Sequence, residues 1–126
     1  MVRIVLADDN ARFRTVLRRL LERDPEIDVV AEAASGAEAV ARCEELRPDV
    51  VLMDVSMPEL DGLEATHRLK ALQPQVVVLL LSVADKEAEI AAGLTRGASE
   101  YLVKGASADE ILAAIKRHGH LAQRAG

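Results

Sequence analysis

Four of the chain's short apolar runs end in polar side chains that could take part in chemistry. In chain order these side chains are Asp8 with Asp9, then Asp54, Ser82 and Lys104. Carboxylates that meet at one place repel one another, by about 4 kcal/mol for two charges ~4 Å apart at an effective dielectric of ~20. Such a group must hold a proton, be solvated or bind a cation, and its oxygen ligands favour Mg²⁺ or Mn²⁺. A carboxylate beside a divalent cation, an ammonium and a hydroxyl is arranged to accept a phosphoryl group.

Each of these side chains also has a purely structural explanation when it is taken alone. An acidic pair or a single aspartate after a strand is often the N-cap of the next helix. A lysine in a loop between a strand and a helix is usually solvated. The functional interpretation therefore depends on whether the four runs end at a common place, which is a question about the fold.

Strand-length apolar runs alternate with helix-length amphipathic segments along the chain. The runs are Val2–Ala7, Asp28–Ala33, Asp49–Met53, Val76–Leu81 and Glu100–Val103. The amphipathic segments lie near residues 11–23, 36–46, 62–72, 85–96 and 107–118. This alternation predicts an α/β fold of the (βα)5 kind, in which a doubly wound five-stranded parallel sheet carries helices on both faces. Ligands of such sheets bind beyond the carboxyl ends of the strands, where the four polar ends are expected to meet.

Local signals mark where the helices should begin and end. The stretches Ser35–Glu38 and Ser107–Glu110 fit the capping box, and Asp61 and Asp85 are further expected N-caps. The expected helix ends are followed by Pro25, Pro48, Pro74 and Gly97. We expect residues 1–118 to form one domain and residues 119–126 to be a fraying C-terminal tail or the start of a linker.

Composition excludes several classes of protein. The chain has 126 residues, of which 50% are hydrophobic and 29% charged, as expected for one globular domain. A formal net charge of -5 and an aromatic content of 2% argue against direct binding of nucleic acid. The single cysteine, Cys43, excludes an internal disulfide and a cysteine-built metal site. The longest apolar run is too short to cross a membrane and no signal peptide is visible, so a cytoplasmic location is expected.

Taken together, the motifs resemble the receiver domain of two-component response regulators, from Val2 to about His118. The most specific part is the string Met-Asp-x-x-Met-Pro-x-x-Asp-Gly at positions 53–62. The stretches at positions 4–9, 81–82 and 97–104 agree with the same family. The Leu-Ser-Val sequence at 81–83 and the loop at 104–107 are similar to the NarL/LuxR-type branch. Many receivers have proline after the lysine, and the Gly105 found here leaves the geometry of that loop open.

The resemblance implies a flavodoxin-like receiver topology with strand order 2-1-3-4-5, and it implies a role for each polar residue. Asp54 would be the phosphoacceptor and would also contact the metal. Asp9 would bind Mg²⁺ directly, Asp8 would act mostly through water, and the backbone carbonyl of Ser56 would complete the protein ligands. Mn²⁺ would be a possible substitute for Mg²⁺.

The remaining implied roles concern the phosphoryl group and the response to it. Ser82 and Lys104 would each bind a phosphoryl oxygen. Tyr101 matches the aromatic switch position, which would turn inward as Ser82 is drawn toward the phosphoryl group. Ser56 and Ala84 stand at positions that influence the lifetime of the acyl phosphate.

The implied function is that of a signalling switch and not of an enzyme with a separate substrate. The partner would be a sensor histidine kinase, and the domain would catalyse only its own phosphorylation and dephosphorylation. The surface formed by the strand at 100–103 and the helices near 85–96 and 107–118 would change and control an output. In NarL/LuxR-type regulators this output is usually transcription through a helix-turn-helix DNA-binding domain, which is absent from this chain. The resemblance leaves open whether the domain forms a homodimer. No contact with a membrane is expected.

Alternatives from other classes fit the residues less well. A phosphatase of the haloacid dehalogenase type needs a second acid two residues after its aspartate, where this chain has Ser56. A flavodoxin-like FMN carrier needs phosphate-binding amides in its first loop, where Asp8 and Asp9 would repel phosphate. A nucleotide-binding fold would carry Gly-x-Gly-x-x-Gly after the first strand, and this sequence does not. A receiver-like interaction module that works without phosphorylation remains the main alternative.

Overall fold

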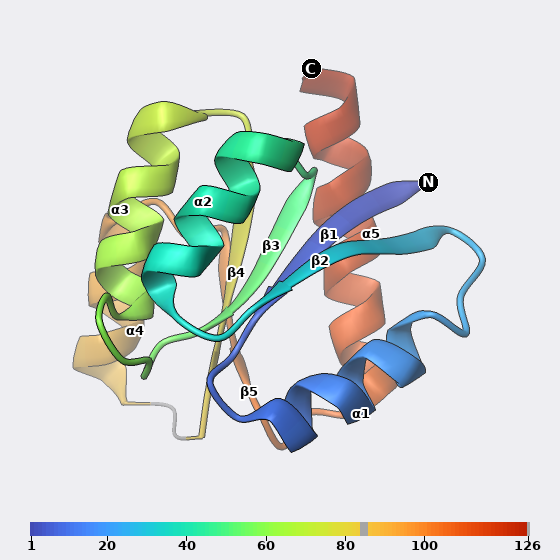
Figure 1. Ribbon diagram of the computed structural model, residues 1–126, viewed down its shortest axis with the longest axis horizontal. Coiled ribbons are helices and arrows are strands. Elements are labelled where there is room, and N and C mark those ends of the chain that lie inside the picture. The colour runs from blue at the N-terminus through green and yellow to red at the C-terminus, as the bar shows by residue number, and fades with distance from the viewer. Residues whose placement is uncertain (84–85, 126) are drawn as a thin grey trace.

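The structure, a computed structural model, describes residues 1–83 and 86–125. Over these residues strands and helices alternate as the (βα)5 prediction requires (Figure 1). The strands are β1 (Val2–Ala7), β2 (Ile27–Ala33), β3 (Val50–Asp54), β4 (Val77–Ser82) and β5 (Glu100–Val103). The helices are α1 (Ala11–Leu21), α2 (Gly36–Leu46), α3 (Gly62–Leu72), α4 (Glu87–Thr95) and α5 (Ala108–Ala125). All strand pairs are parallel and their order is β2-β1-β3-β4-β5, which confirms the predicted topology.

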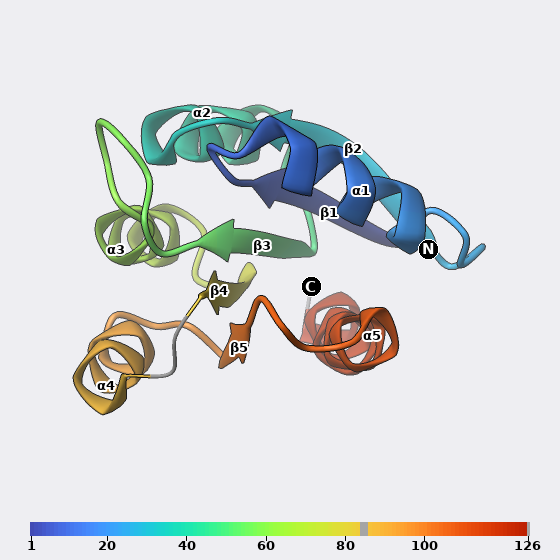
Figure 2. The same ribbon diagram turned by 90° about the horizontal axis from the view of Figure 1, so that it is seen from below.

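The helices cover the two faces of the sheet as separate layers (Figure 2). Helices α1 and α5 lie on one face, and α2, α3 and α4 lie on the other. Strands β3 and β4 are buried at every position, as expected for central strands covered on both sides. One hydrophobic core includes Leu17 and Ile115 on the first face, and a second includes Cys43 and Leu69 on the opposite face. The sheet therefore lies between two hydrophobic cores.

The strand register brings the carboxyl ends of four strands to one edge. Ala7 at the end of β1 pairs with Met53, the residue before Asp54. Asp54 in turn pairs with Leu81, the residue before Ser82. Ser82 pairs with Val103, which is followed by Lys104. The convergence expected from the sequence is therefore present.

Side-chain caps begin most of the helices where the sequence predicts. Backbone amides of Glu38, Glu64 and Glu110 donate to the side chains of Ser35, Asp61 and Ser107. Helix α1 is capped by Asn10, whose side chain accepts from the amide of Phe13. Lys86 precedes α4, while Asp85, the expected cap of that helix, lies outside the described residues.

Helix α5 runs further than expected. We predicted a fraying tail after residue 118, but the helix continues to Ala125. A Cβ at Gly119 would clash with Val2, so the missing side chain lets the helix lie directly against β1. Ala122 is buried, and the side-chain amide of Gln123 donates to Asp49 Oδ2 at 3.1 Å. These contacts with the rest of the domain keep the end of α5 helical. Among the described residues no helix is long and apolar enough to cross a bilayer.

Candidate functional site

The loop after β1 holds two adjacent aspartates in different environments. Asp8 is 5% exposed, whereas Asp9 is exposed to solvent. The amide of Asp8 donates to the Ala33 carbonyl at 2.9 Å, and the amide of Asn10 donates to Asp8 Oδ1 at 2.8 Å. Asp8 is thereby held at its backbone and its side chain, while Asp9 is accessible to solvent.

Asp54 brings a third carboxylate to this edge as the last residue of β3. It is 5% exposed, and the Ser56 amide donates to its Oδ1 at 3.2 Å. A carboxylate oxygen from each of Asp8, Asp9 and Asp54 lies within 4.8 Å of the others. Gly62 allows α3 to start close by, because a Cβ there would overlap the Asp54 carbonyl oxygen.

Lys104 supplies the positive charge of the cluster. Its Nζ lies 2.8 Å from Asp8 Oδ2 and 3.3 Å from Asp54 Oδ2, and 4.6 Å from the centre of the Phe13 ring. Its backbone amide donates to the Ser82 carbonyl at 2.7 Å, which fixes the loop to the end of β4. In the described part of the chain no peptide bond is cis, so the bond to Gly105 is trans.

The surroundings of the cluster raise the pKa values of two of its members, Asp54 and Lys104. Burial and the charge of Asp8 raise the pKa of Asp54 above its ordinary value, against the opposing effects of Lys104 and the Ser56 amide. Burial alone would lower the pKa of Lys104, but its ion pairs with Asp8 and Asp54 outweigh burial and raise it. The Lys104 ammonium is therefore charged at neutral pH. The ionised form of Asp54 is destabilised relative to an aspartate in water.

Ser82 and Tyr101 take the places expected for them, at the end of β4 and within β5. Ser82 is buried and stands one residue beyond Leu81, the register partner of Asp54. Tyr101 is half-buried, and its hydroxyl donates to the carboxylate of Glu89 on α4. A side chain in β5 is thus tied to the helix beside it.

The loop between β3 and α3 carries Ser56, which is exposed. Its amide contacts Asp54, while the metal-binding role of its carbonyl stays a prediction. The loop rests on α2, where a Cβ at Gly36 would overlap the carbonyl oxygen of Leu60. Ala84, the other position linked to acyl phosphate lifetime, lies outside the described residues.

Sequence reasoning missed four residues that support the site. These are Asn10, Phe13, Arg14 and Glu89, which contact the acidic loop, the ammonium of Lys104 and the hydroxyl of Tyr101. The cap residue Asn10 had a local signal, because asparagine before a helical segment is a preferred N-cap. The other three residues make contacts between different elements, and no sequence pattern predicts such contacts.

The donor set fits a hard divalent cation. Three carboxylates converge here and the Lys104 ammonium pairs with two of them, so the cluster keeps an excess of negative charge when all its groups are ionised. All the converging ligands are oxygens, the donors preferred by Mg²⁺ and Mn²⁺. The side chains of Asp54 and Lys104 lie together where a phosphoryl group could be received.

Comparisons with known proteins agree with this geometry. Residues 4–116 match the family model described as the response regulator receiver domain. The chain is 43% identical over 115 residues to transcriptional regulatory protein DegU of Brevibacillus brevis, covering 91% of this chain and 49% of that protein. It is 34% identical over 117 residues to chemotaxis protein CheY of Listeria monocytogenes, covering 93% and 98%.

A solved structure shows the same fold. The signal receiver domain of NarL from Mycobacterium tuberculosis superposes with a TM-score of 0.91 and 33% identity, covering 94% of this chain and 96% of that one. The chain thus spans about half the length of DegU and nearly the whole of CheY and of this domain. Sequence motifs, strand order and the acidic edge all lead to one assignment: the chain belongs to the response regulator receiver domain family.

Proposed function

We propose that Asp54 accepts a phosphoryl group from the phosphohistidine of a sensor histidine kinase. The observation that carries this proposal is the convergence of three carboxylates and Lys104 at one edge of the sheet. In the step, an Asp54 oxygen forms a bond to phosphorus as the phosphorus–nitrogen bond of the phosphohistidine breaks. The bonding electron pair stays with the imidazole nitrogen, which takes up a proton. Catalysis here consists of positioning and charge stabilisation.

Asp8, Asp9, Asp54 and the backbone carbonyl of Ser56 would hold the divalent cation, Mg²⁺ or in its place Mn²⁺. When bound, the cation neutralises negative charge on the phosphoryl oxygens. The proposal is supported by the close approach of the three carboxylates and by their excess negative charge. Asp8 is already paired with Lys104, which favours an indirect contact of Asp8 with the cation and a direct one for the exposed Asp9.

Ser82 and Lys104 would bind phosphoryl oxygens and pass the event on to the surface. Phosphorylation adds about -1.5 to -2 charges and strong acceptor oxygens. Ser82 is drawn toward these oxygens, and Tyr101 then turns inward, which breaks its hydrogen bond to Glu89. The surface of α4, β5 and α5 would change between two states as a result.

The output of the switch is part of the same proposal. We propose control of transcription through a DNA-binding domain that the chain does not contain, because DegU, with 43% identity, is a transcriptional regulatory protein about twice as long. The receiver itself would be a switch that catalyses only its own phosphorylation and dephosphorylation, in the cytoplasm, with a homodimer as one form of the active state.

Incubation with acetyl phosphate, followed by intact mass, tests the assignment of Asp54. We expect the wild type to gain one phosphoryl group only when Mg²⁺ is present, and Asp54→Asn to gain none. Asp49→Asn is a matched control, because Asp49 lies just before the opposite end of the same strand. Modification without the metal, or in Asp54→Asn, would refute the proposal. An unmodified wild type would instead favour an interaction module that works without phosphorylation.

A further inference from the structure

Arg14 of α1 joins the acidic loop to the edge strand β2. Its Nη1 donates to the backbone carbonyl oxygen of Asp8, and its Nε donates to Glu32 Oε1 at 2.7 Å. Glu32 lies on β2, opposite Leu6 of β1. Only 17% of the Arg14 side chain is exposed, so the guanidinium is largely enclosed between the helix, the loop and the strand.

The carbonyl group that Arg14 holds belongs to the peptide unit between Asp8 and Asp9. A peptide unit is planar, so a fixed oxygen also fixes the position of the next Cα atom, that of Asp9. The preceding peptide unit is also held, because the amide of Asp8 donates to the Ala33 carbonyl at 2.9 Å. The position of the exposed Asp9 therefore depends on the orientation of this peptide plane. Arg14, which is anchored to Glu32 of β2, holds that orientation.

We propose that Arg14 is a positioning residue for the acidic site: anchored by Glu32, it orients the Asp8–Asp9 peptide and so presents the Asp9 carboxylate to the divalent cation. The inference rests on the proposed function, because it concerns the same cation. Arg14 does not touch the cation or the phosphoryl group in this role, and acts through the backbone.

The charge of Arg14 and its positioning role should affect Mg²⁺ binding in opposite directions. The sign of the change in Kd therefore separates the two effects. A guanidinium near a cation site repels the cation, so loss of the charge alone would tighten Mg²⁺ binding. Loss of positioning would weaken it, and removing the outer partners of metal ligands typically costs about 10–100-fold in affinity. The direction of the change in Kd therefore distinguishes the explanations.

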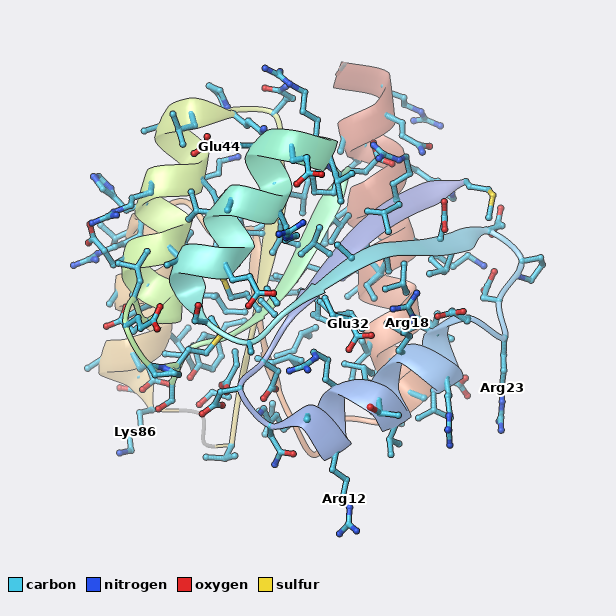
Figure 3. All side chains as sticks on the ribbon, in the orientation of Figure 1. Arg12, Arg18, Arg23, Glu32, Glu44 and Lys86 are labelled. Atoms are coloured by element: carbon cyan, nitrogen blue, oxygen red, sulfur yellow. The ribbon has the colours of Figure 1, made fainter. Side chains whose placement is uncertain are left out.

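Arg18 provides a matched control on the same face of α1. Its Nη1 donates to Glu32 Oε2 at 2.7 Å, and Figure 3 shows Arg18 and Glu32 facing one another between α1 and β2. Its other bonds go to Glu22 and to the Val29 carbonyl. Removing Arg18 thus deletes the same charge and an ion pair to the same carboxylate, but none of its bonds reaches the acidic loop.

The test is a calorimetric titration of Mg²⁺ into wild type, Arg14→Ala, Arg14→Lys and Arg18→Ala, with Asp9→Ala as positive control. We expect the Kd to rise about tenfold in Arg14→Ala. Arg14→Lys should recover part of the affinity, because an ammonium lacks the planar fork that reaches two acceptors. Arg18→Ala should change the Kd by less than about twofold, as expected for a surface ion pair. In metal-free buffer the melting temperature of Arg18→Ala should nevertheless fall at least as far as that of Arg14→Ala.

Amide NMR signals give a second readout in the metal-free protein. The signals of Asp8, Asp9 and Asn10 should shift in Arg14→Ala and stay in place in Arg18→Ala. If Arg14→Ala does not fold, Glu32→Gln and Arg14→Lys provide the same comparison, because each weakens the anchor without deleting the side chain.

Three outcomes would overturn the inference. An unchanged or tighter Kd in Arg14→Ala would show that its charge matters more than its position. Equal weakening in Arg18→Ala would reduce the effect to general stability. A wild type that binds no Mg²⁺ would refute the proposed function itself, and this inference with it.

Discussion

The Nζ atom of Lys104 lies 2.8 Å from Oδ2 of Asp8, closer than its 3.3 Å distance to Oδ2 of Asp54. One ammonium thus balances two buried carboxylates, one in the loop after β1 and the other at the end of β3. Its side chain is 18% exposed and lies against the Phe13 ring, which limits its freedom to leave the site. The lysine holds the site together before any phosphoryl group arrives.

Replacing Lys104 by methionine should separate metal binding from phosphoryl transfer. Lys104→Met keeps a side chain over Phe13 and removes the charge, so Mg²⁺ should bind at least as tightly as in wild type. The rate of phosphorylation by acetyl phosphate should fall about a hundredfold, the scale for losing one stabilising donor. Lys86→Met, at the exposed Lys86 before α4, is the control and should change neither. Unaltered transfer kinetics in Lys104→Met would remove the lysine from the mechanism.

The raised pKa of Asp54 predicts a dependence of stability on pH. The native state holds the Asp54 proton to a higher pH than the unfolded chain does, so stability is lost as pH rises through the raised pKa. In metal-free buffer at pH 7, Asp54→Asn should therefore be more stable than wild type, because the amide carries no charge to bury. The gain should vanish below the ordinary pKa of an aspartate. Urea unfolding from pH 3 to pH 8 measures it, and a constant difference would contradict the prediction.

The hydrogen bond between Tyr101 and Glu89 should stabilise the arrangement of α4 against β5. Tyr101→Phe and Glu89→Ala should each lower the free energy of unfolding by about 1 kcal/mol, and the double variant by little more than either alone. A urea double-mutant cycle measures this coupling. Glu87→Ala, at an exposed position in the first turn of α4, is the control. Fully additive losses would show that the two side chains do not interact in solution.

Gly36 and Gly105 should respond differently to the same substitution. A Cβ at position 36 would overlap the Leu60 carbonyl oxygen, whereas a Cβ at position 105 meets nothing within 4 Å. Gly36→Ala should lower stability by about 2 kcal/mol or more and slow phosphorylation, because the loop that carries Ser56 must move. Gly105→Ala should stay within about 0.5 kcal/mol of wild type. Thermal unfolding with the acetyl phosphate assay tests both, and equal effects would contradict the packing argument.

Local patterns along the chain were enough to predict the strands, the helices and the residues that end them. The apolar run before Asp54 predicts a central strand because it is hydrophobic at every position, and β3 is buried throughout. Ser35 and Asp61 begin helices because their side chains accept from amides three residues later. Such signals lie within a few residues of one another, so they can be read without knowing the fold.

Contacts between side chains of different elements could not be predicted in this way, because they depend on the folded chain. The sequence placed Asp8 and Asp9 together, but the packing of the loop buries one and exposes the other. It did not predict that α5 would continue past residue 118, since Gly119 and Ala122 matter only against β1 and the core. It also said nothing of Arg14 and the Asp8 carbonyl. Contacts of this kind depend on the strand register and on how helices cross the sheet, and these are set by the packing of the whole chain and not by any local pattern.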